Sequence, residues 1–292
     1  MNTKTKGILC ITISAFCFAW MNAFVRLSGD LPSIQKSFFR NFIAAIFAFI
    51  ILVRNHTPLR WEKGNLKYLL LRSAAGTVGI LCNFYAVDHL VLSDASMLNK
   101  MSPFFAIIFS YFFLKEKCTP VQIFGVVCAF VGSLFIIKPT FTNMELIPSL
   151  VGFVGGLGAG AAYTTVRYLG QRGEKGPFIV FFFSAFSCLV TLPALIVDFH
   201  PMTMAQTAYL LLAGLAAAGG QFAITAAYCY APSREISVYD YSQIIFSALL
   251  GFFLFGQLPD GYSILGYVII CAMAVLMFFY NNRKVARLRD NI

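Results

Sequence analysis

Charged side chains interrupt otherwise apolar runs at several places in the 292-residue chain, and three of them carry the prediction of a binding site. Arg40 lies in the run "SFFRNFIAAIFAFIILVRN", Lys100 in the run 92–114 and Asp240 in the run 235–256. An ionised side chain at the centre of a membrane helix costs about 2.5–3.5 kcal/mol, so it usually faces water, a partner or a ligand. A guanidinium suits a carboxylate, because its planar fork donates two parallel hydrogen bonds. Arg40 and Lys100 therefore predict recognition of an acidic group inside a membrane protein.

Amide and aromatic side chains within the apolar runs complete the predicted binding site. Amides would orient a ligand, and aromatic rings would stack on a planar group or a cation. For any single aromatic residue, packing or contact with lipid is an equally good interpretation. The residues predicted to contact a substrate are Trp20, Asn22, Arg40, Asn83, Tyr85, Asn99, Lys100, Tyr163, Gln221, Tyr228, Tyr239, Asp240 and Gln243.

Helical spacing groups several of these residues. Ser96, Asn99, Lys100 and Pro103 follow each other at intervals of three or four residues, which predicts one polar face of a helix. Tyr239, Gln243 and Ser247 follow the same rule, with Asp240 on the flank of that face. The two polar faces are predicted to form two walls of one cavity.

Ion pairing is the competing interpretation for the charged residues. Asp240 is expected at about the level of Arg72, so it either pairs with Arg72 or Arg234 or carries a coupling proton. Arg40 and Lys100 are expected about 9 and 12 Å from the outer helix ends, at 1.5 Å per residue. The nearest acids, Asp88 and Asp94, would lie closer to the surface. Arg40 and Lys100 are therefore predicted to be unpaired cations.

The composition places most of the chain in lipid. Apolar residues make up 59% of it and charged residues 12%, whereas a soluble domain has about 25% charged residues. The net charge of +10 comes from basic residues scattered between apolar runs, which does not favour nucleic-acid binding. The sequence contains no GxSxG or HExxH motif, and neither an enzyme activity, a metal site nor a cofactor is predicted.

An all-α, polytopic membrane fold with ten transmembrane helices is predicted, because a span needs about 20 apolar residues. The first span follows a basic head and lacks a cleavage site, so it is expected to be retained. The predicted spans cover residues 7–28, 34–53, 68–88, 92–114, 120–138, 146–168, 176–197, 207–230, 235–256 and 262–280.

Lysine and arginine predict the orientation in the membrane. With both termini in the cytoplasm, fifteen basic residues lie in cytoplasmic segments and three lie on the opposite side. The three are Arg26, Lys36 and Lys138. The bias predicts an integral protein, most simply of the bacterial inner membrane, with cytoplasmic N- and C-termini.

An internal repeat is predicted from a shift of 141 residues, which lays the first five spans on the last five without a gap. The shift aligns Gly79 with Gly220 and Ser96 with Ser237. Because five is odd, the second copy must enter the membrane from the opposite face. The predicted units are 7–138 and 146–280, and inverted repeats of this kind place a substrate site near the midplane between them.

The glycine-rich stretch "VGFVGGLGAGAAY" has two interpretations. A dinucleotide-binding loop would need a preceding strand and a soluble βαβ unit, and the sequence predicts neither. Gly152, Gly156 and Gly160 instead recur every four residues on one helix face. Small residues at this spacing predict close helix packing in the membrane.

Three segments resemble the EamA-type members of the drug/metabolite transporter superfamily. They are "FFRNFIAAIF", "LRSAAGTVGILCNFYAVDHLVLSDASMLNKMSPFFAIIFSYFFLKEK" and "SVYDYSQIIFSALLGFFLFGQLPDGYSILGYVII". The resemblance implies ten helices, two inverted repeats and a cavity lined mainly by spans 1–4 and 6–9. Within the family, the FFR motif and the pair Tyr239 and Tyr241 are similar to S-adenosylmethionine uptake permeases.

The function expected from these features is secondary transport of a small polar metabolite with a carboxylate, by alternating access. Its expected partners are the substrate, the lipid bilayer and, as coupling ion, protons. One alternative is uptake or exchange of S-adenosylmethionine or a similar nucleoside-containing cofactor. An alternative of another class is a membrane-embedded lipid-modifying enzyme or a scaffold without transport activity.

Overall fold

The computed structural model describes residues 3–114, 119–137, 145–230 and 239–289, and these residues form helices and loops without a strand. The order is α1 (Thr3–Leu27), α2 (Ser33–Arg54), α3 (Leu66–His89), α4 (Leu92–Asn99), α5 (Ser102–Leu114), α6 (Pro120–Ile137), α7 (Leu146–Gln171), α8 (Gly176–Val197), α9 (Met204–Tyr230), α11 (Ser242–Phe255) and α12 (Gly261–Arg289). The prediction of an all-α fold is therefore confirmed for the part of the chain that the structure describes.

Seven of the described helices are long and apolar enough to cross a membrane: α1, α2, α3, α7, α8, α9 and α12. Shorter apolar helices cover Ile123–Ile137 and Ser242–Phe255. Large apolar side chains cover much of the outer surface, among them Val78, which is 49% exposed, and Ile46, which is 40% exposed. Such a surface is stable in lipid, so the chain is an integral membrane protein.

Helix α2 shows why Arg40 can lie within an apolar run. Its buried face carries Gln35, Lys36, Ser37, Arg40 and Asn41. Its exposed face carries large apolar side chains, namely Phe42, Ile46, Phe47, Phe49 and Ile50. The helix is thus polar toward the bundle and apolar toward its surroundings, as a charged residue in lipid requires.

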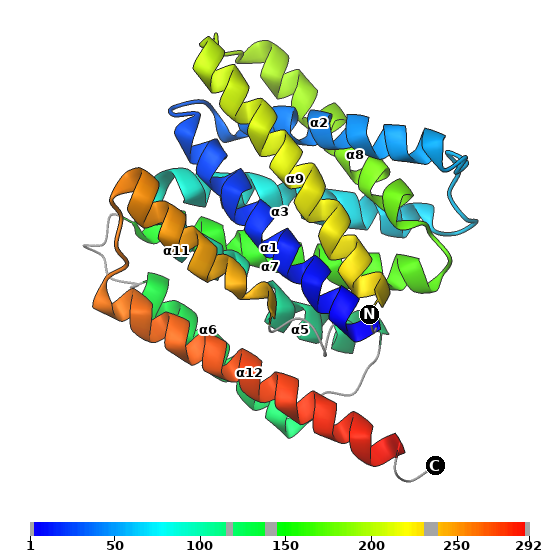
Figure 1. Cartoon of the computed structure of the whole chain (residues 1–292), viewed down its shortest axis with the longest axis vertical. Helices are drawn as coiled ribbons and strands as arrows, with labels where there is room; N and C mark the ends of the chain where they lie inside the picture. Colours follow the sequence, from blue (N-terminus) through cyan, green and yellow to red (C-terminus); the bar gives the residue numbers. More distant parts are fainter. Residues whose placement is uncertain (1–2, 115–118, 138–144, 231–238, 290–292) are drawn as a thin grey trace.

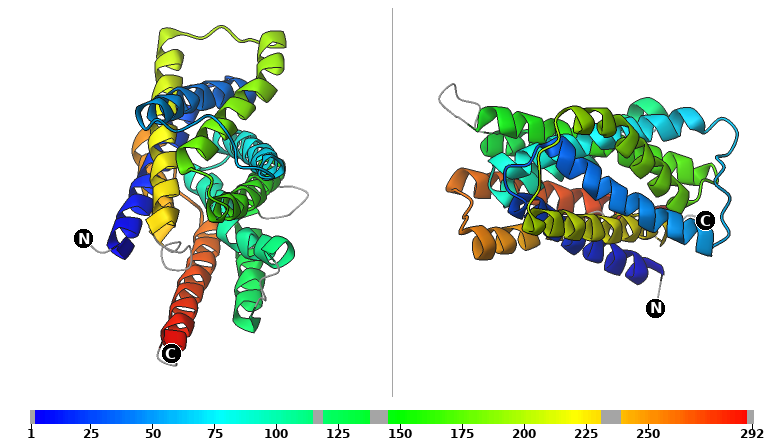
Figure 2. Two further views of the ribbon diagram at one scale, coloured as in Figure 1. Left: turned by 90° about the vertical axis from the view of Figure 1, so that its right-hand side faces the viewer. Right: turned by 90° about the horizontal axis from the view of Figure 1, so that it is seen from above.

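Neighbouring helices come mostly from opposite halves of the chain. The most extensive contacts join α1 to α9, α3 to α7, α2 to α8 and α6 to α12, and Figure 1 shows α6 and α12 side by side at one edge of the bundle. Two views agree that α1 begins and α12 ends at the same end of the bundle (Figures 1 and 2). The loops that join α2 to α3 and α7 to α8 lie at that end as well.

Glycines allow α7 to approach its neighbours closely, as the sequence predicts. A Cβ at Gly156 would lie 2.4 Å from the Leu98 carbonyl oxygen of α4, and one at Gly160 would lie 2.8 Å from the Ser102 carbonyl oxygen of α5. A Cβ at Gly158 would lie 2.8 Å from the Ala75 carbonyl oxygen of α3. The packing interpretation of the glycine face is therefore confirmed.

Gly156→Ala should destabilise the protein, because the new methyl group meets backbone that cannot rotate away. Overpacking of this kind typically costs about 1–3 kcal/mol. Gly170→Ala is a matched control on the same helix, since nothing lies within 4 Å of its added Cβ. Thermal unfolding in detergent should show a lower midpoint for Gly156→Ala and an unchanged or higher one for Gly170→Ala. Equal midpoints for the two variants would contradict the close packing of α7 on α4.

The span predicted over 92–114 is not one helix, which corrects the sequence prediction. α4 ends at Asn99, Lys100 is its C-cap residue, and α5 begins at Ser102. Pro103 explains the break, because proline lacks a backbone N–H and its ring clashes with the carbonyl of the fourth residue before it, Asn99. The polar face predicted to run from Ser96 to Pro103 is therefore interrupted at Lys100.

Candidate substrate site

A cavity of about 70 Å³ lies among α1, α2, α3, α4, α7, α8, α9 and α11. Its lining consists of Phe18, Met21, Asn22, Arg40, Arg72, Gly76, Gly79, Ile80, Asn83, Asn99, Lys100, Ala159, Ala162, Tyr163, Phe183, Gln221 and Gln243. The cavity has room for water but is much smaller than the roughly 300–1,000 Å³ of ordinary ligand sites. This conformation is therefore closed around its polar residues.

Most of the site residues predicted from the sequence meet around this cavity. Asn22, Arg40, Asn83, Asn99, Lys100, Tyr163, Gln221 and Gln243 all line it. They come from α1, α2, α3, α4, α7, α9 and α11, with Lys100 directly after α4. Residues that are far apart in the sequence thus share one small polar volume inside an apolar bundle.

Arg40 is held by a short chain of hydrogen bonds between α2 and α8. Its side chain is buried, and Nη1 donates to Asn41 Oδ1 at 2.5 Å. Asn41 Nδ2 donates in turn to Ser187 Oγ at 2.9 Å and to the Ser37 carbonyl at 2.9 Å. The Nε–H of Arg40 has no hydrogen-bond acceptor among the described residues. Among the described residues only neutral groups position the guanidinium, so none of them balances its charge.

Arg72 is a second buried guanidinium at the cavity, and the sequence prediction of the site omitted it. Its Cζ lies 3.7 Å from the centroid of the Phe183 ring, and Arg40 Cζ lies 5.8 Å from the same centroid. Gly76 makes room for this arrangement, because a Cβ there would lie 2.4 Å from Arg72 Nη1 and 2.9 Å from Phe183 Cε2. A glycine one helical turn after a buried arginine was the signal in the sequence.

Lys100 forms an ion pair with Asp240, which corrects two predictions. Lys100 Nζ lies 2.6 Å from Asp240 Oδ2, and both side chains are about 2–3% exposed. Lys100 is therefore not an unpaired cation, and among the described residues Asp240 pairs with Lys100 rather than with Arg72. Arg234, the other partner considered for Asp240, lies outside the described residues. The break after α4 explains the error. The depth of Lys100 in the membrane was estimated for a straight helix, and that estimate does not apply beyond the break.

The ion pair belongs to a set of contacts between α4 and α11. Tyr241, the N-cap residue of α11, donates its hydroxyl to the Lys100 carbonyl oxygen at 3.1 Å. That carbonyl lies at the end of α4, where the helix leaves its last carbonyls without partners in its own turn. Ser96 Oγ and Ser247 Oγ are 2.7 Å apart one turn further on. The two predicted polar faces do meet.

Several buried polar atoms at the cavity have no partner within the described part of the chain. They are Asn22 Nδ2, Arg40 Nε, Arg72 Nε and Nη1, Asn83 Oδ1 and Gln243 Oε1. Asn83 and Asn22 bond each other through Nδ2 and Oδ1 at 3.1 Å, which leaves the other half of each amide unpaired. Buried polar groups are nearly always hydrogen-bonded in proteins, so this cluster is prepared for water or a ligand.

Other predicted site residues lie away from the cavity lining. Trp20 packs against Phe16 and Phe24. Tyr85 stacks on His89 with ring centroids 4.2 Å apart. Tyr239 is 37% exposed and contacts Phe278 edge to face. The side chain of Tyr228 is outside the described residues. Helical spacing groups residues on a face but does not tell which face points inward.

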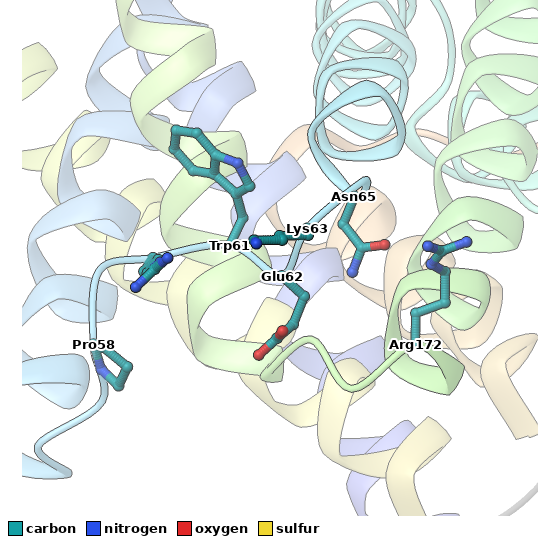
Figure 3. A pocket seen from close by; sticks show the side chains of 7 residues that line it. Pro58, Trp61, Glu62, Lys63, Asn65 and Arg172 are labelled. Atoms are coloured by element: carbon teal, nitrogen blue, oxygen red, sulfur yellow. The ribbon is translucent and has the colours of Figure 1, made fainter.

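A second hollow, of about 470 Å³, lies where the α2–α3 loop meets the end of α7 (Figure 3). It is lined by Pro58, Arg60, Trp61, Glu62, Lys63, Asn65 and Arg172. Beside it, Glu174 Oε1 accepts hydrogen bonds from the Glu62 backbone N–H at 2.8 Å and from Asn65 Nδ2 at 3.0 Å. The basic residues here are exposed, so water balances their charge and the hollow offers little selectivity.

An apolar helical bundle with a buried polar cavity fits a membrane transporter, and comparisons with known proteins show the family. The chain belongs to the EamA-like transporter family, within the drug/metabolite transporter superfamily. The profile of that family matches residues 5–138. The pseudopaline exporter CntI of Pseudomonas aeruginosa is 31% identical over 274 residues, which cover 93% of this chain and 95% of the exporter.

More distant relatives are transporters as well. The riboflavin transporter of Brucella anthropi is 28% identical, over 83% of this chain and 88% of that protein. Human solute carrier family 35 member G1 is 24% identical, over 92% of this chain and 78% of that protein. One crystal structure, with 14% sequence identity, superposes on this chain with a TM-score of 0.69. The match covers 93% of this chain and 96% of the other one, which shows a shared fold.

Proposed function

We propose that this transporter carries a small polar metabolite with a carboxylate group, which Arg40 binds in the central cavity. The observation that carries the proposal is the buried guanidinium of Arg40, which neutral groups hold in place and no described carboxylate neutralises. Leaving a buried charge uncompensated costs several kcal/mol. A bound anion would remove that cost, and this makes the site selective for anions.

We further propose that residues 7–138 and 146–280 form two inverted repeats with ten spans in total. The 141-residue shift supports this, because it lays α1 on α7, α2 on α8, α3 on α9 and α6 on α12. The contact between α1 and α9 then has its counterpart in the contact between α7 and α3, and the contacts α2–α8 and α6–α12 join corresponding helices. The family profile also covers little more than the first unit.

The cavity itself follows the same pseudo-symmetry. Under the shift Asn22 corresponds to Tyr163, and Ile80 to Gln221, and all four residues line the cavity. Lys100, which caps α4, corresponds to Tyr241, which caps α11, and the two are hydrogen-bonded. Discontinuous helices near the interface of two repeats are the usual place for a substrate site in transporters with inverted repeats, and the break between α4 and α5 is such a place.

Alternating access requires that each end of the closed cavity can open. At the start of α2, Gln35 Nε2 donates to the His200 carbonyl at 2.9 Å, and Gln35 Oε1 accepts from the His200 N–H at 3.0 Å. Beyond the other end of α2, Glu174 bonds Glu62 and Asn65. We propose that these two contacts break in turn, the second one at the cytoplasmic face of a bacterial inner membrane, where both termini would lie.

Other candidate functions follow from the sequence. Exchange of S-adenosylmethionine, or of a similar nucleoside-containing cofactor, would use the same cavity. Countertransport of labelled S-adenosylmethionine by proteoliposomes distinguishes it from carriage of a simple carboxylate. Membership of a transporter family weighs against the lipid-modifying enzyme and the scaffold.

Protons are the proposed coupling ion through Asp240, and a flux that does not change with pH would remove that role.

Access to the cavity can be measured with single cysteines on α3, in a transport-active variant without the native cysteines. Asn83 lines the cavity, whereas Val78 is 49% exposed on the outer surface of the same helix. Asn83→Cys should react with a membrane-impermeant thiol reagent from both sides of the membrane, because the cavity opens to each side in turn. Val78→Cys should react from neither. Protection of Asn83→Cys from both sides, at every substrate concentration, would contradict alternating access.

A further inference from the structure

The charges around the cavity do not balance. Three cationic residues line it, namely Arg40, Arg72 and Lys100. Asp240 neutralises Lys100 through the 2.6 Å ion pair. The salt bridges of the described residues give no carboxylate partner to either arginine. Both guanidiniums are about 2% exposed, so bulk water does not screen them. The described residues of the site therefore carry an excess of two buried positive charges.

The two arginines act on one small volume. Both guanidinium carbons lie near the Phe183 ring, at 3.7 and 5.8 Å from its centroid, so they are within 9.5 Å of each other, the sum of these distances. Three of their N–H-bearing atoms, Arg40 Nε and Arg72 Nε and Nη1, have no acceptor in the described part of the chain. A cation is attracted to an aromatic face much more weakly than to an anion. The ring of Phe183 therefore orients the guanidiniums without neutralising them.

We propose that the substrate site is built for a doubly negative ligand, with Arg40 and Arg72 as the pair that binds its two charges. This inference rests on the proposed transport function and specifies its substrate class. Guanidinium groups bind carboxylate and phosphate oxygens through two parallel hydrogen bonds. Two of them on one ring fit either two carboxylates on one short chain or one phosphate monoester.

The distribution of charge between the proposed repeats strengthens this inference. Under the 141-residue shift, Arg40 corresponds to Phe181 and Arg72 to Ala213. Both cations thus come from one half of the chain, although α2 and α8 pack together as equivalent helices. The contact between α2 and α8 is thus symmetric under the shift, whereas the two arginines have no charged counterpart in the second half. Charge at these two positions is therefore a property of the ligand site rather than of the scaffold.

Binding of matched anions to the purified full-length protein tests the inference. The probes are butyrate as a monoanion, succinate as a dicarboxylate and glycerol 3-phosphate as a phosphate monoester, with thermal stabilisation and a binding titration as readouts. One of the two dianions should bind about tenfold or more tightly than butyrate, because it makes a second set of charge-assisted hydrogen bonds. The dianion that binds more tightly shows whether the site takes two carboxylates or a phosphate monoester. Equal binding of all three probes, or no binding of any, would overturn the inference.

Variants can test whether Arg72 binds the second negative charge of the ligand. Arg72→Gln should weaken binding of the dianion much more than binding of butyrate, so that the preference for the dianion falls to nearly one. Gly76→Ala keeps the charge but displaces Arg72 and Phe183, so it should lower the same preference even if Arg72→Gln does not fold. Arg60→Gln removes an exposed cation outside the cavity and should leave the preference unchanged.

The outcomes separate this inference from the proposed function. If Arg72→Gln lowers binding of monoanion and dianion equally, Arg72 does not read a second charge and the inference fails. Transport of a monoanion that depends on Arg40 would then still support the proposed function. If no anion is transported by the wild-type protein in proteoliposomes, the proposed function itself fails.

Discussion

Arg40→Gln should lower transport by about a hundredfold or more while leaving the protein folded. A bidentate pair between a guanidinium and an anion makes two charge-assisted hydrogen bonds, each of about 1.5–3 kcal/mol, and every 1.4 kcal/mol is a factor of ten. Glutamine keeps hydrogen-bonding groups for Asn41 but has no charge. The loss is to be measured as the initial rate of flux, or of counterflow, in proteoliposomes with equal amounts of protein.

Stability distinguishes a binding role of Arg40 from a structural one. Because its charge is not compensated by a described carboxylate, removal of the charge also removes a desolvation cost. The melting temperature of Arg40→Gln should therefore be equal to that of the wild-type protein or higher. Arg60→Gln, with the same change in net charge at an exposed site, should keep both flux and melting temperature. A large drop in the melting temperature of Arg40→Gln would show that Arg40 holds α2 and α8 together instead.

Lys100→Met should be among the most destabilising single substitutions in the chain, at about 3–5 kcal/mol, since it leaves Asp240 charged and buried without a partner. Asp240→Asn should have a similar effect by leaving Lys100 alone. The double variant Lys100→Met, Asp240→Asn should recover most of the stability, because a buried ion pair can be replaced by neutral groups at little cost. Reversible unfolding in mixed micelles measures all three.

The pair Lys36 and Asp88 is a matched comparison at the same Nζ–Oδ distance of 2.6 Å, but its carboxylate is 18% exposed. Water can solvate a partner that is partly exposed, so Asp88→Asn should cost clearly less than Asp240→Asn. If the double variant at positions 100 and 240 were as unstable as the single ones, the effect would come from packing around the helix break. The ion pair would then not hold α4 and α11 together.

Transport by the double variant addresses the role of the ion pair in the mechanism. Lys100 lines the cavity and its partner Asp240 precedes the N-cap of α11, so the pair joins the break between α4 and α5 to the start of α11. A stable double variant that still transports would restrict the pair to a structural role. One that binds the substrate without moving it would show that the pair takes part in the change of access.

Much of the membrane architecture could be predicted from the sequence. Every predicted span contains a described helix, because about 20 apolar residues in a row have no other stable form in lipid. The glycine face of α7 was predictable for a similar reason, since spacing alone places small residues on one side. Arg40 was predictable as an inward-facing residue, because the cost of a guanidinium in lipid leaves few other orientations.

Only the tertiary structure decided which polar residues meet. Lys100 and Asp240 were expected at different depths, and the break at Lys100 and Met101 brings them together. The role of Arg72 depends on Phe183, a residue of α8 with no polar group to mark it, and on the space left by Gly76. Trp20, Tyr85 and Tyr239 have the right chemistry but face other partners. Hydrophobicity and periodicity act locally along a helix, whereas contacts between helices depend on where each helix bends, ends and leaves room.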